Sequence, residues 1–287
     1  MRFPRLATAT AAVLVAAFAS AEEAVVSRGE YLVHAGGCIV CHTDDGKQAI
    51  PLAGGRSLET PFGTFYSPNI TPDPTTGIGE WTDEEFLRAF WEGVNPDGDH
   101  YYPSFPYTSY TGISREDLLA MKAYLFSLDP VEKQVPEHEL ALFISTRLAA
   151  GAWKLLNFKS GRFNPSDNRS TAWNRGAYLV RHLGHCGECH TPRDSLGAIR
   201  DDRELAGNRD MPDGESAPNI SPHRADGIGK WSVDDIEYFL DIGILPDGDS
   251  TDSVMSAVVD TSTSKLTKED RLAIATYLKS VPAQPGE

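Results

Sequence analysis

The chain has 287 residues, of which 40% are hydrophobic and 23% are charged, a composition typical of a globular protein. This length suits two compact domains, each large enough to bury its own core. The 41 acidic and 26 basic residues give a formal net charge of −15, which argues against nucleic acid as a partner. An acidic surface serves either solubility alone or the steering of a basic protein partner.

The N-terminus has the pattern of a secretory signal. Two arginines precede an apolar run, residues 7–17, that ends in Ala19-Ser20-Ala21. The run is shorter than the roughly 20 residues needed to cross a bilayer, and no later stretch is long and apolar enough either. We therefore expect a signal peptide over residues 1–21, a mature chain in the periplasm from about Glu22, and no direct membrane span.

The four cysteines form two identical Cys-x-x-Cys-His patterns, at residues 38–42 and 186–190. An oxidising compartment would favour two disulfides, but this spacing is the attachment signature of haem c. Two thiols one helical turn apart can add to the two vinyl groups, and the adjacent histidine then lies beneath the iron. A zinc site would need further ligands, and a thioredoxin-like dithiol would not need the histidine. We expect two haem c groups, with covalent attachment at Cys38, Cys41, Cys186 and Cys189 and proximal iron ligands at His42 and His190.

Segments that follow the first motif recur after the second. The sequence Pro-Asn-Ile-Thr/Ser-Pro begins at Pro68 and again at Pro218, and Gly-Ile-Gly-x-Trp begins at Gly77 and Gly227, both at a shift of 150 residues. Two copies are too few for a solenoid, so each copy should be a self-contained haem domain. We predict domains over residues 22–130 and 173–287.

Each predicted domain consists of short helices between Gly/Pro loops, and no strand pair is convincing. Apolar residues at spacings of three and four predict helices over residues 83–92, 114–128, 233–243 and 267–280. The connector, residues 131–172, has no counterpart in the repeat. It contains an apolar stretch, residues 139–156, which we expect to be a helix that packs the two domains together. The predicted fold class is all-α.

With these segments the chain resembles the class I c-type cytochromes, in particular the cytochrome c subunits of bacterial alcohol and gluconate dehydrogenases. The resemblance covers nearly the whole mature chain and is carried by both attachment motifs, Leu52–Gly55, Phe62–Thr64, Pro68–Pro72, Gly77–Trp81, Tyr102–Tyr107, Tyr124–Leu125, Pro218–Pro222 and Gly227–Trp231. It implies two tandem helical haem domains and redox protein partners: a dehydrogenase subunit as donor and a cytochrome c or an oxidase as acceptor. Those subunits have three haems and a membrane segment, whereas this chain has two haem motifs and no predicted membrane span. The resemblance therefore does not imply quinone reduction by this chain.

A class I cytochrome usually completes its iron with a methionine from the C-terminal half of the domain. Met255 follows His190 by 65 residues and is the expected distal ligand of the second haem. Met211, in a Pro/Gly loop, is the weaker alternative, since methionines often fill gaps. At the shift of 150 the position of Met255 falls on Phe105, and phenylalanine cannot bind iron.

The first haem therefore has three open alternatives for its distal side. His100, on an Asp-Gly turn, is the tentative distal ligand; a five-coordinate or water-bound iron is the second alternative, and His34 or another group is the third. Met121 fits better as a core residue. Unequal ligation predicts a lower potential for the first haem, so that electrons enter there and leave through the second.

Three further residues have expected roles at the haems. Arg56 and Arg209 follow matching Leu-Ala-Gly triplets and are tentative partners of the propionates, since a guanidinium suits paired carboxylate oxygens. Pro51 lies near the point where the resemblance implies a proline carbonyl that orients the proximal imidazole, and a simple role in the loop is the open alternative.

The leading interpretation is an electron carrier, in which the cofactor supplies the redox chemistry. A dihaem enzyme with an open N-terminal haem, peroxidase-like or thiosulfate-oxidising, is the alternative, and a gas sensor is the third possibility. No residue outside the haem motifs stands out as catalytic, and no output module is visible.

Overall fold

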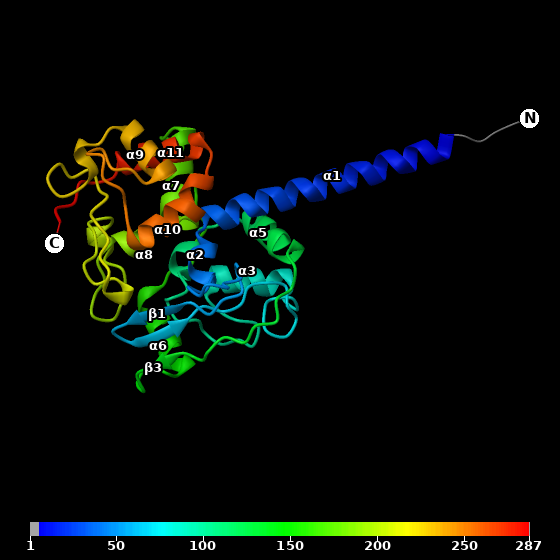
Figure 1. The fold of residues 1–287 in the computed structure, drawn as a ribbon, viewed down its shortest axis with the longest axis horizontal. Coiled ribbons are helices and arrows are strands. Elements are labelled where there is room, and N and C mark those ends of the chain that lie inside the picture. Colours follow the sequence, from blue (N-terminus) through cyan, green and yellow to red (C-terminus); the bar gives the residue numbers. More distant parts are fainter. Residues whose placement is uncertain (1–5, 287) are drawn as a thin grey trace, which may run out of the picture.

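The computed structural model describes residues 6–286 and is mostly helical (Figure 1). The first helix, α1 (Leu6–Ala35), projects from the body of the molecule at its N-terminal end and packs into it at its C-terminal end. Part of the predicted signal peptide, residues 1–5, lies outside the described residues, and the rest lies on the projecting end of α1. Among residues 6–286 no helix combines the length and hydrophobicity that crossing a membrane requires.

We call residues 22–130 the first half of the chain. After α1 its elements are α2 (Cys38–His42), β1 (Ser57–Thr60), β2 (Gly63–Tyr66), α3 (Asp83–Glu92), α4 (Tyr107–Tyr110) and α5 (Arg115–Ser127). Local signals set the ends of α3: Thr82 and Glu85 form a reciprocal capping box, and Gly93 closes the helix in the left-handed conformation.

We call residues 173–286 the second half. Its helices are α7 (Thr171–Tyr178), which begins in the last two residues of the connector, α8 (Gly187–His190), α9 (Val233–Ile242), α10 (Ser253–Thr261) and α11 (Lys268–Leu278). Shorter turns join them: a π turn η1 (Leu179–Leu183) and 3-10 turns η2 (Asp201–Arg203), η3 (Pro212–Gly214), η4 (Ile228–Lys230) and η5 (Thr263–Lys265). The four helices predicted from apolar spacing are confirmed as α3, α5, α9 and α11.

The same helix crossing occurs in both halves. α1 packs against α5 with Gly29 beside the carbonyl of Ala120, and α7 packs against α11 with Gly176 beside the carbonyl of Ala273. At each crossing a Cβ atom would collide with the facing carbonyl oxygen. Glycine therefore allows the two backbones to approach closely.

The π turn η1 explains a change in the spacing between the halves. Gly29 and Gly176 are 147 residues apart, whereas Cys38 and Cys186 are 148 apart. The extra residue is accommodated where the amide of Gly184 donates to the carbonyl of Leu179, at 2.7 Å, five residues back. A π turn is the form that one inserted residue takes in a helix.

The expectation of no strand pair was wrong. β1 and β2 form an antiparallel hairpin, and β3 (Glu139–Leu140) adds to β2 in the order β1-β2-β3. The strands of the hairpin carry threonine, phenylalanine and tyrosine, which favour extended backbone, but four residues are too few for a visible alternation. The fold is thus mostly helical rather than all-α.

The connector is also less helical than expected. It runs beside the first half, supplies β3, and contains one helix, α6 (Arg147–Asn157). The leucines of α6 do not pack the halves together: Leu148, Leu155 and Leu156 are 84%, 88% and 78% exposed. The helix nevertheless contacts both halves: Gly151 lies against the ring of His100 in the first half, and Trp153 Nε1 donates to the carbonyl of Leu196 in the second half at 2.8 Å.

The two halves share one core and are joined by a reciprocal pair of hydrogen-bonded clusters. Tyr31 of α1 donates to Asp270 Oδ2 at 2.6 Å, and Arg175 donates to both oxygens of Asp270 at 2.8 and 2.6 Å. In the mirror arrangement, Tyr178 donates to Asp117 Oδ2 at 2.6 Å, and Arg28 pairs with the same carboxylate. Each half thus lends a tyrosine to an aspartate of the other, and we call these two clusters the reciprocal clasp.

Candidate haem attachment sites

Both cysteine pairs have the geometry that attachment to a porphyrin requires. α2 carries Cys38, Cys41 and His42 on little more than one turn, and the second motif has the same form around α8. No disulfide joins any of the four cysteines. Burial raises the pKa of Cys38 to about 12 and that of Cys186 to about 11. Two cysteine side chains held one turn apart can reach the two vinyl groups of one porphyrin.

The two motif histidines are oriented in the same way. Nδ1 of His42 donates to the carbonyl of Pro68 at 2.8 Å, and Nδ1 of His190 donates to the carbonyl of Pro218 at 2.7 Å. A carbonyl can only accept, so Nε2 keeps its lone pair, as an iron ligand must. Burial lowers the pKa of both rings, against the opposing effect of these hydrogen bonds, which favours neutral imidazole. The donor set therefore fits a haem iron at each motif.

These contacts correct the expectation for Pro51. The prolines that orient the imidazoles are Pro68 and Pro218, the first residues of the repeated Pro-Asn-Ile segments. The repeat could have identified these prolines, because a segment present in both halves is expected to have the same role in each. Pro51 was chosen instead for its position nine residues after the first motif.

A strained loop is fastened to each proline segment. The amide of Ile70 donates to the carbonyl of Leu52 at 2.9 Å, and the amide of Ile220 donates to the carbonyl of Leu205 at 3.0 Å. Leu52 and Leu205 have φ values of 65° and 63°, in the left-handed region that costs energy for a residue with a side chain. The amide of Gly54 then donates to the carbonyl of His42, and the amide of Gly207 to that of His190, both at 2.8 Å. The proximal sides of the two sites are therefore built alike.

The two motifs lie close together at the junction of the halves. α10 of the second half packs on α2 (Figure 1). α4 of the first half packs on η1, beside the second motif. His185, the residue before Cys186, is bound through Nε2 to the carbonyl of Gly36, two residues before Cys38, at 3.2 Å.

The residues expected on the distal sides occupy different surroundings. Met255 lies half-buried in the first turn of α10. Phe105 stands in an aromatic cluster, with ring centroids 5.3 Å from Phe90, 5.3 Å from Tyr101 and 5.4 Å from Tyr110. Iron ligation by Met255 remains a prediction.

The ring of His100 faces α6, and its Nδ1 is buried with no hydrogen-bond partner among the described residues. His34 Nδ1 is bound to the carbonyl of Thr261 at 2.7 Å. Met211 accepts a hydrogen bond from Asn208, and Met121 is fully buried in the core. A distal role for His100 also remains a prediction.

The two arginines expected near the propionates differ in exposure. Arg56 is largely buried and donates to the carbonyl of Val40 at 2.8 Å, so it fastens the loop to α2. Arg209 is exposed in the loop after Gly207. Contact of either arginine with a propionate remains a prediction.

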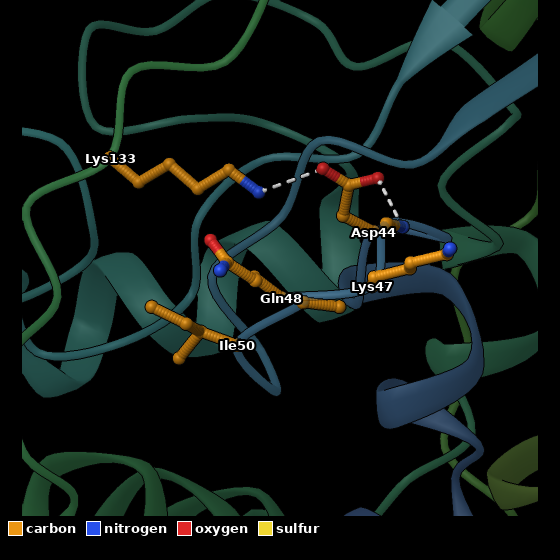
Figure 2. A pocket seen from close by; sticks show the side chains of 7 residues that line it. Asp44, Lys47, Gln48, Ile50 and Lys133 are labelled. Carbon is orange, nitrogen blue, oxygen red and sulfur yellow. Dashed lines mark hydrogen bonds and ion pairs between the residues drawn. The ribbon is translucent and has the colours of Figure 1, made fainter.

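An open pocket lies beside the loop that follows the first motif, lined by Asp44, Lys47, Gln48, Ile50 and Lys133, among others (Figure 2). Lys133 of the connector reaches across it to Asp44 Oδ2 at 3.3 Å and to the carbonyl of Gly54 at 2.7 Å. The amide of Gly46 and the ammonium of Lys133 lower the pKa of Asp44. Lys133 of the connector thus fixes the position of the loop that follows the first motif.

Comparison with known proteins agrees with this geometry. Residues 26–129 match the family model "Cytochrome c". The chain is 44% identical over 265 residues to a diheme cytochrome c-type protein of Cereibacter sphaeroides, covering 90% of this chain and 86% of that protein. It is 40% identical over 272 residues to the gluconate 2-dehydrogenase cytochrome c subunit of Pantoea cypripedii, covering 92% of this chain and 61% of that protein. It is 39% identical over 268 residues to the fructose dehydrogenase cytochrome subunit of Gluconobacter japonicus, covering 93% of this chain and 54% of that longer protein.

Proposed function

Because the chain belongs to the cytochrome c family, we propose that it carries two haem c groups and transfers electrons from a dehydrogenase to a downstream cytochrome or oxidase. The observation that carries this proposal is the pair of Cys-x-x-Cys-His motifs whose histidines are oriented alike by Pro68 and Pro218. Two proximal sites of one design support two tandem cytochrome c domains, residues 22–130 and 173–287.

The protein's own residues hold and orient the cofactor in this scheme. When bound, haem supplies one-electron redox chemistry at its iron. The four motif cysteines would hold the two porphyrins covalently, and His42 and His190 would be iron ligands whose rings the proline carbonyls orient. Met255 would be the second protein ligand at the second motif.

The relatives support the proposed partners, and the N-terminal sequence supports the proposed location. The Pantoea relative is the cytochrome c subunit of a gluconate dehydrogenase, which supports a dehydrogenase as donor. The N-terminal signal pattern supports the periplasm, where cytochromes of this kind can receive electrons.

Removing one pair of cysteines tests the haem number directly. In a variant with Cys186→Ser and Cys189→Ser, haem content measured as the pyridine haemochrome should fall from two per chain to one, because each pair binds its own porphyrin. The matched change of Cys38 and Cys41 should give the same value. A wild-type chain with a single covalent haem would contradict the proposal.

The aromatic surroundings of Phe105 favour one second candidate, a first haem open to small ligands. We expect carbon monoxide to alter the visible spectrum of the reduced protein at one haem, and Phe105→Met to abolish that change and raise the lower midpoint potential, since a Met/His pair favours Fe(II). A fully low-spin spectrum that carbon monoxide leaves unchanged would exclude the peroxidase-like and thiosulfate-oxidising alternatives.

A further inference from the structure

The two attachment motifs differ in charge at one buried position. The third residue of the second motif, Glu188, is 8% exposed, and the residue at the same place in the first motif is the buried Val40. A buried carboxylate is costly unless it is paired and hydrogen-bonded. Glu188 must therefore have partners, and its charge acts on whatever lies nearby.

Glu188 is held from both halves of the chain. Its Oε1 accepts hydrogen bonds from Thr108 Oγ1 at 3.0 Å and from Ser109 Oγ at 2.7 Å, both on α4 of the first half. Its Oε2 pairs with Arg193 of the second half at 2.6 Å. These donors hold the carboxylate in one position at the junction of the halves.

The field of this carboxylate reaches the atoms that bind the second porphyrin. Glu188 lies inside the second motif, one residue before Cys189 and two before His190, so its carboxylate belongs to the segment that would hold the second porphyrin. Arg193 also donates to the backbone carbonyl of Glu188, at 3.0 Å, and so fixes this segment beside the ion pair.

We propose that Glu188 lowers the reduction potential of the second haem and so sets the difference in potential between the two haems. One-electron reduction of Fe(III) to Fe(II) removes one positive charge from the site, and a nearby negative charge in a medium of low dielectric constant favours the oxidised form. Glu188 thus opposes the increase in potential that a Met255 ligand gives, whereas the first motif has the uncharged Val40 at the same place. This inference rests on the proposed function, because it requires a haem at each motif.

The experiment measures both midpoint potentials of the purified two-haem protein by spectroelectrochemical titration. The variant Glu188→Gln keeps the shape of the side chain and loses its charge. In it the potential of the second haem should rise clearly, and that of the first haem should rise by less. Arg193→Gln, which leaves the carboxylate without its cation, should shift the same potential downward. A residue that only stabilised the fold would not produce shifts of opposite sign. Glu269→Gln is the matched control, because Glu269 is an exposed carboxylate of the second half whose field is screened by solvent and salt.

Haem content separates failure of this inference from failure of the proposed function. Two haems per chain in every variant, with potentials that Glu188→Gln leaves unchanged, would overturn the role of Glu188 and leave the electron carrier intact. Fewer than two haems in the wild-type protein would overturn the proposed function itself. If Glu188→Gln is the one variant that loses haem, the potentials of Arg193→Gln test the inference. An unchanged or raised potential of the second haem in Arg193→Gln would contradict it.

Discussion

Gly176→Ala should lower the free energy of unfolding by roughly 3 kcal/mol, because a methyl group has no room at the crossing of α7 and α11. The new Cβ would collide with the carbonyl oxygen of Ala273, lie 2.6 Å from its carbonyl carbon and 2.8 Å from Cβ of Tyr277. Backbone atoms cannot rotate away, so the two helices must separate. Chemical denaturation monitored by circular dichroism measures the change.

Gly161→Ala is the control for this substitution. A Cβ at Gly161 meets no atom within 4 Å, so its stability should equal that of the wild-type protein or exceed it slightly. Gly29→Ala, at the equivalent crossing of α1 and α5, should reproduce the loss seen for Gly176→Ala. Equal stability of all three variants would mean that the helices do not approach as closely as described.

Asp270→Asn should destabilise the protein by roughly 2–3 kcal/mol at neutral pH, since Asp270 accepts the hydrogen bonds of both Tyr31 and Arg175 in one cluster of the reciprocal clasp. The partly exposed Arg175 keeps the loss below that of a fully buried pair. Asp260→Asn, at an exposed position of α10, is the control and should change stability little.

The effect of Asp270→Asn should also depend on pH. Burial on its own would raise the pKa of Asp270, but hydrogen bonds from Arg175 and Tyr31 outweigh it and hold the pKa below the ordinary value. A carboxyl with a lowered pKa contributes its full stability above the ordinary pKa of about 3.9, and the contribution is lost as the pH falls through the native pKa. The gap between wild type and variant should therefore narrow below about pH 4 in urea titrations. A gap that stays constant down to pH 2 would contradict the described ion pair.

Local sequence patterns predicted the parts of the fold that depend on local contacts. The helices that begin at Asp83 and Lys268 each follow a capping threonine, Thr82 and Thr267. Their apolar residues recur at helical spacing within one short segment. The cysteine motifs likewise contain their whole geometry within five residues. Such features need no knowledge of the rest of the chain.

Features that depend on pairing between distant residues could not be predicted in this way. β3 exists because Glu139 meets Thr64 across 75 residues, and Tyr31 finds Asp270 across 239. The exposed leucines of α6 misled the prediction for the same reason: an apolar stripe shows that a helix has an apolar face, and not where that face points.

The reciprocal clasp has a consequence for the inheritance of this chain. Each aspartate is completed by a tyrosine encoded more than 60 codons away in the other half, so neither half can be separated without losing a donor to its own buried carboxylate. A change at Asp117 is felt at Tyr178, and a change at Asp270 is felt at Tyr31. Substitutions in the two halves are therefore coupled, even though each half has its own haem motif.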